Sequence, residues 1–173
     1  SFYKFTVNDN NAIRFGMGAI KGVGENAVKT IVEVRKEGRF KSIFDLAKRI
    51  DLRAANKKAF ENLALAGGFD EFGDTHRAQY FHTDGDNSSF LEKAIRFGAK
   101  FQENENSSQV SLFGDASDVQ IAEPNVPPCE EWNTLEKLSR EKEVVGIYIS
   151  GHPLDDYKFE MKYFCNTKLQ ALH

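Results

Sequence analysis

The sequence predicts a mainly α-helical protein with one short β-hairpin at its start. A strand-like alternation is confined to the beginning of the chain, and apolar residues recur at helical spacing along most of the rest. Capping residues and glycines stand where helices should begin and end. The chain has 173 residues, of which 40% are hydrophobic and 28% charged. This composition allows a packed core in one medium domain or two small ones.

The β-hairpin is predicted over residues 1–16. "YKFTV" alternates apolar and polar residues, "NDNN" supplies turn formers, and "AIRFG" resumes the alternation.

Two successive helix–loop–helix units are predicted within residues 17–102. In the first, a short apolar helix leads through a glycine loop into a second helix, which carries "AVKTIVEV" and is closed by Gly38. In the second, Ser42 begins one helix, Asn56 caps the next, and the "GG" pair after "LALA" ends it. The second loop lacks glycines, so the two units are related in structure rather than in sequence.

Further helices are predicted at about residues 75–82 and 88–102. Residues 103–130 are rich in Glu, Asn, Ser and Asp, contain three prolines and show no period, which predicts a mobile linker. Residues 131–173 should be helical again. We expect a long helix that continues through "VVGIYIS", because glycine and proline follow in "SGHP", and a shorter helix in "PLDDYKFEMKYF".

The charge is distributed unevenly along the chain. Residues 1–60 hold 13 Lys and Arg against 6 Asp and Glu, whereas the remainder holds 10 against 20, which leaves a net charge of -3. The basic first third favours a polyanion as partner. No run of 18 apolar residues is present, so no membrane span is predicted. Cys129 and Cys165 have no metal-like spacing and are typical of reduced thiols in a cytoplasmic protein.

The stretch "AIKGVGENAVKTI" fits the helix-hairpin-helix pattern. Gly22 and Gly24 let the backbone approach a ligand closely, and the first amides of the following helix lack internal partners. These amides and the positive end of the helix dipole suit a phosphate oxygen. We expect Val23 to join the two helices, and Lys21 and Lys29 to add charge beside the site. Such a site would bind DNA without sequence preference and in a salt-dependent manner.

Three alternatives remain for this loop. It is a plain turn without a ligand, the DNA-binding accessory domain of a repair nuclease or glycosylase, or part of a module that binds only proteins. Some glycosylases carry a nucleophilic lysine shortly after such a loop, but Glu25 and Asn26 occupy those places here.

The predicted linker contains "QVSLF", which resembles the pentapeptide by which bacterial replication proteins bind the sliding clamp. Leu112 and Phe113 would fill a partner's pocket, Gln109 would supply an amide hydrogen bond and Ser111 a small polar contact. The alternative is a loop that folds back on its own domain.

Several longer strings resemble the alpha subunit of bacterial replicative DNA polymerase III. They are "IRFGMGAIKGVGENAVKTIVEVRKEGRFKSIFDLAKRID", "NLALAGGFDEFG" and "SREKEVVGIYISGHPLDDY". The resemblance implies a fragment of a larger chain. Its segments would be the end of the fingers region (1–16), a tandem helix-hairpin-helix DNA-binding domain (17–102), a linker with a clamp-binding peptide (103–130) and a helical connector toward an oligonucleotide-binding domain (131–173).

The resemblance also implies function. In the family the tandem domain binds the double-stranded primer–template DNA, so Asp51 to Lys57 would form the second hairpin, with Arg53 and Lys57 on phosphates. The sliding clamp and other replicase subunits would be further partners. The family's catalytic aspartates lie in its palm, before residue 1. We therefore expect no catalytic residue, metal site or cofactor in this segment of a DNA-directed DNA polymerase that needs magnesium elsewhere.

Overall fold

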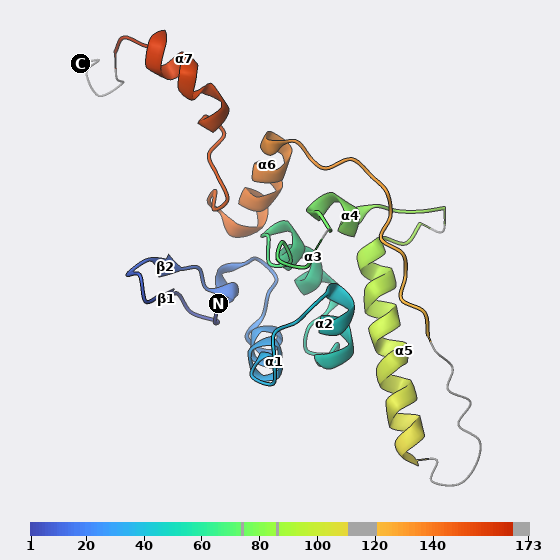
Figure 1. The fold of residues 1–173 in the computed structure, drawn as a ribbon. Coiled ribbons are helices and arrows are strands. Elements are labelled where there is room, and N and C mark those ends of the chain that lie inside the picture. The colour runs from blue at the N-terminus through green and yellow to red at the C-terminus, as the bar shows by residue number, and fades with distance from the viewer. Residues whose placement is uncertain (74, 86, 111–120, 168–173) are drawn as a thin grey trace.

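The computed structural model describes residues 1–73, 75–85, 87–110 and 121–167, with only the backbone described for 107–110. It is mainly helical with a two-stranded hairpin at the start, which confirms the predicted class (Figure 1). The strands are β1 (Thr6–Val7) and β2 (Ile13–Arg14), and the short 3-10 helices are η1 (Met17–Ala19) and η2 (Asp155–Tyr157). The α-helices are α1 (Glu25–Arg35), α2 (Ile43–Arg49), α3 (Lys57–Leu65), α4 (Arg77–Phe81), α5 (Phe90–Val110), α6 (Thr134–Val145) and α7 (Lys158–Tyr163).

The N-terminal hairpin forms where its alternation predicts it. Thr6 pairs with Arg14 and Val7 with Ile13 in an antiparallel register. The turn is held by Asn8, whose side-chain oxygen accepts hydrogen bonds from two amides of the "NDNN" stretch and its neighbour, at 3.1 and 2.9 Å.

The first helix–loop–helix unit begins with only the 3-10 turn η1 instead of the predicted α-helix. Its residues include Gly18, and Gly16 directly precedes it. Glycine is a poor helix former, and Gly16 also packs so closely on the backbone of Lys4 that a Cβ would lie 2.6 Å from its carbonyl carbon. The helix after the loop, α1, matches the prediction.

The second unit follows its capping residues. Ser42 Oγ accepts from the amide of Asp45 at 3.1 Å, and Asn56 Oδ1 accepts from Ala59 at 3.0 Å, so α2 and α3 begin as predicted. Helix α3 ends at Leu65, and Gly67 just beyond it has φ of +80°. The amide of Gly68 then donates a 2.8 Å hydrogen bond back to the Leu63 carbonyl.

The core lies between α1, α2, α3 and α5. Phe44 of α2 meets Phe90 and Phe97 of α5 edge to face, with ring centroids 5.7 and 5.5 Å apart. The two helices approach most closely at Gly98, where a Cβ would lie 2.5 Å from the carbonyl oxygen of Ala47. This contact fixes the direction of α5 relative to both helix–loop–helix units.

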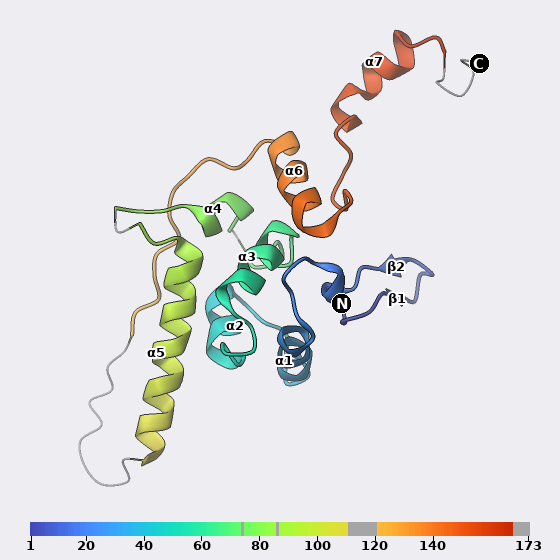
Figure 2. The same cartoon turned by 180° about the vertical axis from the view of Figure 1, so that it is seen from behind.

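Helix α5 continues eight residues beyond the predicted end at 102, into the segment predicted as linker. The stretch "ENENSSQV" contains neither glycine nor proline, so nothing local stops the helix. Gln102 anchors it, because its Nε2 donates to the carbonyls of Ala47, Lys48 and Ile50 at 2.9 to 3.1 Å. Residues 121–133 return beside α5 in an extended conformation (Figures 1 and 2).

Helix α6 ends at Val145, and the predicted continuation through "VVGIYIS" is wrong. Gly146 takes φ of +85°, a left-handed conformation that terminates the helix. The amides of Ile149 and Ser150 then bind the side chain of Glu141 instead of helix carbonyls, at 2.5 and 2.9 Å. Helix α7 forms as predicted and extends away from the rest of the molecule (Figure 2).

Candidate functional site

The glycine loop between η1 and α1 has a conformation that requires glycine at one of its two positions. Gly22 has φ of +73°, and a Cβ there would lie 3.0 Å from Nδ2 of Asn62. Gly24 precedes α1 in an extended conformation, and a Cβ there would meet nothing within 4 Å. Open space above Gly24 leaves the N-terminus of α1 accessible to a ligand.

The amides of the loop divide into occupied and open groups. Val23 donates to the Ile20 carbonyl at 3.1 Å, and Lys21 donates to the Val144 carbonyl of α6 at 2.8 Å. The amides of Gly22 and Gly24 have no hydrogen-bond partner among the described residues. Because Gly24 has no side chain to cap α1, the first-turn amides of this helix are also open. The Val23 amide is therefore not available to a phosphate. The amides of Gly22, Gly24 and the first turn of α1 remain available.

The side chains around this loop are arranged as the sequence predicts. Val23 is buried with 4% exposure, in contact with the core below the loop. Lys21 and Lys29 are exposed and make no ion pair within the part of the chain that the structure describes. Glu25 is also exposed in the first turn of α1, so the local field is less positive than the two lysines alone would give.

Asn62 connects this loop to α3 through a contact that the sequence analysis missed. Its side chain is 2% exposed, and its Nδ2 donates to the carbonyl of Lys21. The Lys21 peptide is therefore held on both sides, by α3 through its carbonyl and by α6 through its amide. A polar residue on the apolar face of a predicted helix would have been the hint.

The second loop offers side chains rather than amides. Asp51 accepts hydrogen bonds from the amides of this loop. Its Oδ1 accepts from the amide of Arg53 at 2.9 Å, and its carbonyl accepts from the amides of Ala54 and Ala55 at 3.2 and 3.0 Å. Arg53 itself is exposed. The group that this loop leaves open to a ligand is therefore the side chain of Arg53.

Lys57 is less available than Arg53. Its ammonium contacts the carboxylate of Glu92 and lies 3.6 Å from Glu61. The hydrogen bond that the Lys57 ammonium donates to Glu92 is the main reason that the pKa of Lys57 is raised. Glu92 is itself held by the amide of Ser89 at 2.9 Å, so a phosphate would have to displace a fixed carboxylate.

The predicted clamp-binding residues Gln109, Ser111, Leu112 and Phe113 lie outside the described residues, apart from the backbone of Gln109 in the last turn of α5. The described residues that follow this segment are held against the rest of the molecule. Glu123 pairs with Lys48 at 2.8 Å, and the Pro127 carbonyl accepts from Gln79 at 2.9 Å. Figure 1 shows the end of α5 pointing away from α6 and the hairpin.

Among the described residues, no three His, Cys, Asp or Glu side chains gather as a metal-binding group. Asp155 is occupied by the amide of His152 at 2.7 Å and the ammonium of Lys158 at 3.0 Å. No helix within the described ranges is long and apolar enough to cross a membrane.

The two loops and their helices define a helix-hairpin-helix protein. Residues 1–80 match the family model described as a helix-hairpin-helix motif. The chain is 38% identical over 169 residues to the DNA polymerase III subunit alpha of Vibrio cholerae serotype O1, which covers 96% of the chain and 14% of that protein. The corresponding protein of Campylobacter jejuni is 43% identical over 148 residues, which cover 85% of the chain and 12% of that protein. That of Escherichia coli K12 is 34% identical over 174 residues, with 99% and 14% covered.

The chain therefore belongs to the family of DNA polymerase III alpha subunits, in which it matches one segment. It spans only about one-seventh of the length of these relatives.

Proposed function

We propose that this chain binds double-stranded DNA without sequence preference, as the segment of a cytoplasmic replicative polymerase that holds the newly made duplex. The observation that carries the proposal is the open N-terminus of α1 behind Gly22 and Gly24, with two exposed lysines beside it. Nucleotidyl transfer and its magnesium would belong to parts of the polymerase outside this chain.

The glycine loop supplies the stronger contact in this proposal. A phosphate oxygen accepts from the open amides of Gly22, Gly24 and the first turn of α1, and the helix dipole adds roughly half a positive charge. Lys21 and Lys29 displace counterions from the DNA when they contact its phosphates. Each phosphate neutralised contributes about -0.9 to the slope of log K against log salt.

The second loop supplies a weaker contact. Arg53 is free to form a bidentate pair with a phosphate. Lys57 must first exchange Glu92 for the phosphate, so its net contribution is smaller. The two loops together would position the duplex through its backbone and would not read its bases.

We further propose that Gln109, Ser111, Leu112 and Phe113 bind a sliding clamp. In the sequence, Leu112 and Phe113 are an isolated apolar pair in a polar stretch, a pattern typical of a peptide for a partner's pocket. Burial of one leucine and one phenylalanine yields roughly 3–6 kcal/mol. A micromolar complex needs about 8 kcal/mol, so the peptide depends on DNA to keep the clamp nearby.

Gly24→Asp tests the duplex site without disturbing the fold. Aspartate is a favoured helix cap and meets no atom within 4 Å here, so the stability of the chain should hold or rise. Its carboxylate would nevertheless occupy the open amides and repel phosphate. We expect duplex affinity, measured by fluorescence anisotropy, to fall at least tenfold, about 1.4 kcal/mol.

Gly85→Asp is the matched control, because it makes the same charge change at another open glycine and should leave affinity within about twofold of the parent, close to 0.4 kcal/mol. Unchanged duplex affinity in Gly24→Asp, or affinity insensitive to salt, would rule out the backbone site.

A further inference from the structure

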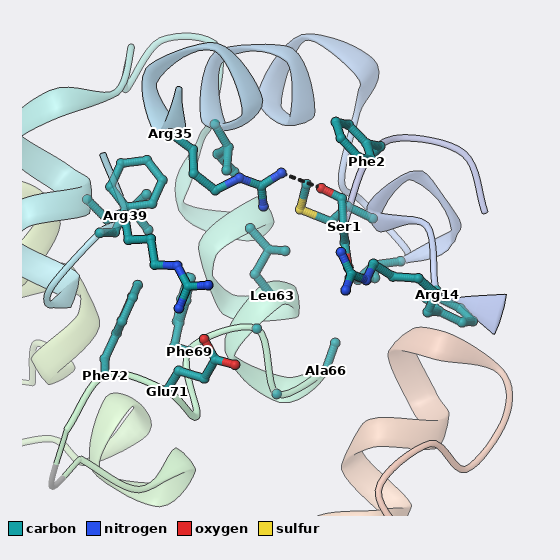
Figure 3. Close-up of a pocket in the computed structure, with 18 of the residues that line it drawn as sticks. Ser1, Phe2, Arg14, Arg35, Arg39, Leu63, Ala66, Phe69, Glu71 and Phe72 are labelled. Carbon is teal, nitrogen blue, oxygen red and sulfur yellow. Dashed lines mark hydrogen bonds between the residues drawn. The ribbon is translucent and has the colours of Figure 1, made fainter. Parts of the chain in front are cut away.

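A cleft of about 790 Å³ lies on a part of the molecule that the proposed duplex site does not use. Its walls are the N-terminal segment, the C-terminal end of α1 with the residues that follow, and the turn after α3 (Figure 3). Its lining combines cations and aromatic rings, chiefly Phe2, Arg14, Arg35, Arg39, Phe69 and Phe72.

Three guanidinium groups face this one space (Figure 3). Arg35 donates from Nη2 to the carbonyl of Ser1 at 2.8 Å and keeps its other nitrogens unengaged. Arg14 and Arg39 have side chains without a hydrogen bond or ion pair to any residue that the structure describes. Glu71 is the acidic side chain of the lining, so the cleft keeps a positive excess.

Aromatic rings stand between these cations. Phe69 and Phe72 are stacked, with centroids 5.5 Å apart and planes at 10°. Phe69 is buried, whereas Phe72 is partly exposed on the cleft side. Phe2 is 48% exposed, with the guanidinium of Arg35 5.7 Å from its ring centre. Free aromatic faces beside unpaired arginines are the features of sites that stack bases and hold phosphates.

We propose that this cleft binds an unpaired stretch of nucleic acid. Phosphates lie against Arg14 and Arg39, and a base stacks on the exposed face of Phe72 or Phe2. The volume is typical of pockets for small ligands, about 300–1,000 Å³, and suits unpaired nucleotides better than a duplex. The site is independent of the glycine loop and adds a single-strand function to the proposed duplex binding.

The first test measures binding of a fluorescent oligothymidylate of about 12 nucleotides, a length within the range of single-strand sites. Arg39→Ala should weaken binding about tenfold and reduce the salt slope by about 0.7, the value for one phosphate of a single strand. Phe72→Leu keeps an apolar side chain but removes the ring, and should weaken binding about fivefold. Lys100→Ala, which removes one exposed charge from α5 outside the cleft, should change neither quantity.

Gly24→Asp separates this site from the duplex site. It should weaken duplex binding at least tenfold and leave the oligothymidylate affinity unchanged. Arg39→Ala should weaken oligothymidylate binding about tenfold and leave the duplex affinity unchanged. If Gly24→Asp reduced the duplex affinity and the oligothymidylate affinity equally, the single strand would bind at the glycine loop, and the proposal would be overturned. So would complete competition by a polyglutamate peptide together with normal binding by Phe72→Leu, because the cleft would then be a site for acidic peptides.

Discussion

The first hairpin depends on one buried amide side chain. Asn62 holds the carbonyl of Lys21, and its own Oδ1 is buried without a partner. The hydrogen bond stabilises the fold by about 1 kcal/mol. The buried oxygen without a partner destabilises it by about 1–3 kcal/mol, so the two effects oppose each other. Asn62 is therefore better explained by the loop conformation that it fixes than by the stability that it adds.

Asn62→Leu should change duplex affinity more than stability. Leucine has a similar volume and removes both the hydrogen bond and the orphaned oxygen, so we expect the free energy of unfolding in urea to change by about 1 kcal/mol or less. The Lys21 peptide would be released from α3, and duplex affinity should fall about tenfold, or 1.4 kcal/mol. Unchanged affinity in a folded variant would show that Asn62 does not position the loop.

Residue-level prediction from sequence succeeded where a local rule applied. The role of Gly22 in the loop could be predicted because a tight loop before a helix requires a positive φ. The burial of Val23 could be predicted because it is an apolar residue between two glycines. Asn62 could not, because its partner lies 41 residues away and no local pattern marks the pair.

At the scale of elements, a buried ion pair attaches α6 to the tandem domain. Arg77 is 5% exposed and Glu141 is fully buried, with 3.0 Å between Nη1 and Oε2. Arg77 also holds Asp70 at 2.7 Å, and Glu141 holds the amides of Ile149 and Ser150. Since Val144 of α6 holds the Lys21 amide, this ion pair also supports the first hairpin.

The attachment of α6 should weaken in acid. Burial alone would raise the pKa of Glu141, but the hydrogen bonds from Ser150, Ile149 and Arg77 outweigh it and lower the pKa below its usual 4.5. The folded state therefore binds this proton less tightly than the unfolded state. The stabilisation is complete above about pH 4.5 and is lost as pH falls through the lower folded-state pKa.

Glu141→Gln measures this contribution. Arg77 retains its ion pair with Asp70 in this variant. We therefore expect the free energy of unfolding at pH 7 to fall by about 3 kcal/mol, near the lower end of the range for a broken buried pair. Urea unfolding between pH 3 and pH 7 should show a shallower pH dependence in the variant than in the parent. Parallel curves would mean that other carboxylates carry the acid sensitivity.

Element boundaries were predictable only where the stop signal is local. The caps at Ser42 and Asn56 fixed α2 and α3, whereas α5 passed its predicted end because residues 103–110 contain no glycine or proline. The run after Val145 was expected to be helical from its apolar residues. Its amides are satisfied instead by a buried carboxylate, Glu141, an alternative that no window of sequence reveals.

For the whole molecule, the arrangement separates the proposed contacts in space. The glycine loop lies at the end of α1 nearer to α6, while α5 packs along α2 and its C-terminal end points away from α6 (Figures 1 and 2). The resemblance to the polymerase family could be found from sequence because the strings around the first hairpin are distinctive. The relation between the two proposed surfaces could not, because it depends on the packing of α5 on α2 at Gly98.

This separation predicts that clamp binding and duplex binding fail independently. Replacing Leu112 and Phe113 with alanine should abolish capture by an immobilised bacterial sliding clamp, because the two apolar anchors are lost, and should leave duplex affinity in anisotropy unchanged. Leu154→Ala with Phe159→Ala removes the same two residue types from exposed positions near α7 and should retain clamp binding. Addition of duplex DNA should strengthen capture of the parent chain and of this control by raising the effective concentration. Simultaneous loss of clamp and duplex binding in the first variant would mean that the peptide belongs to the DNA-binding fold.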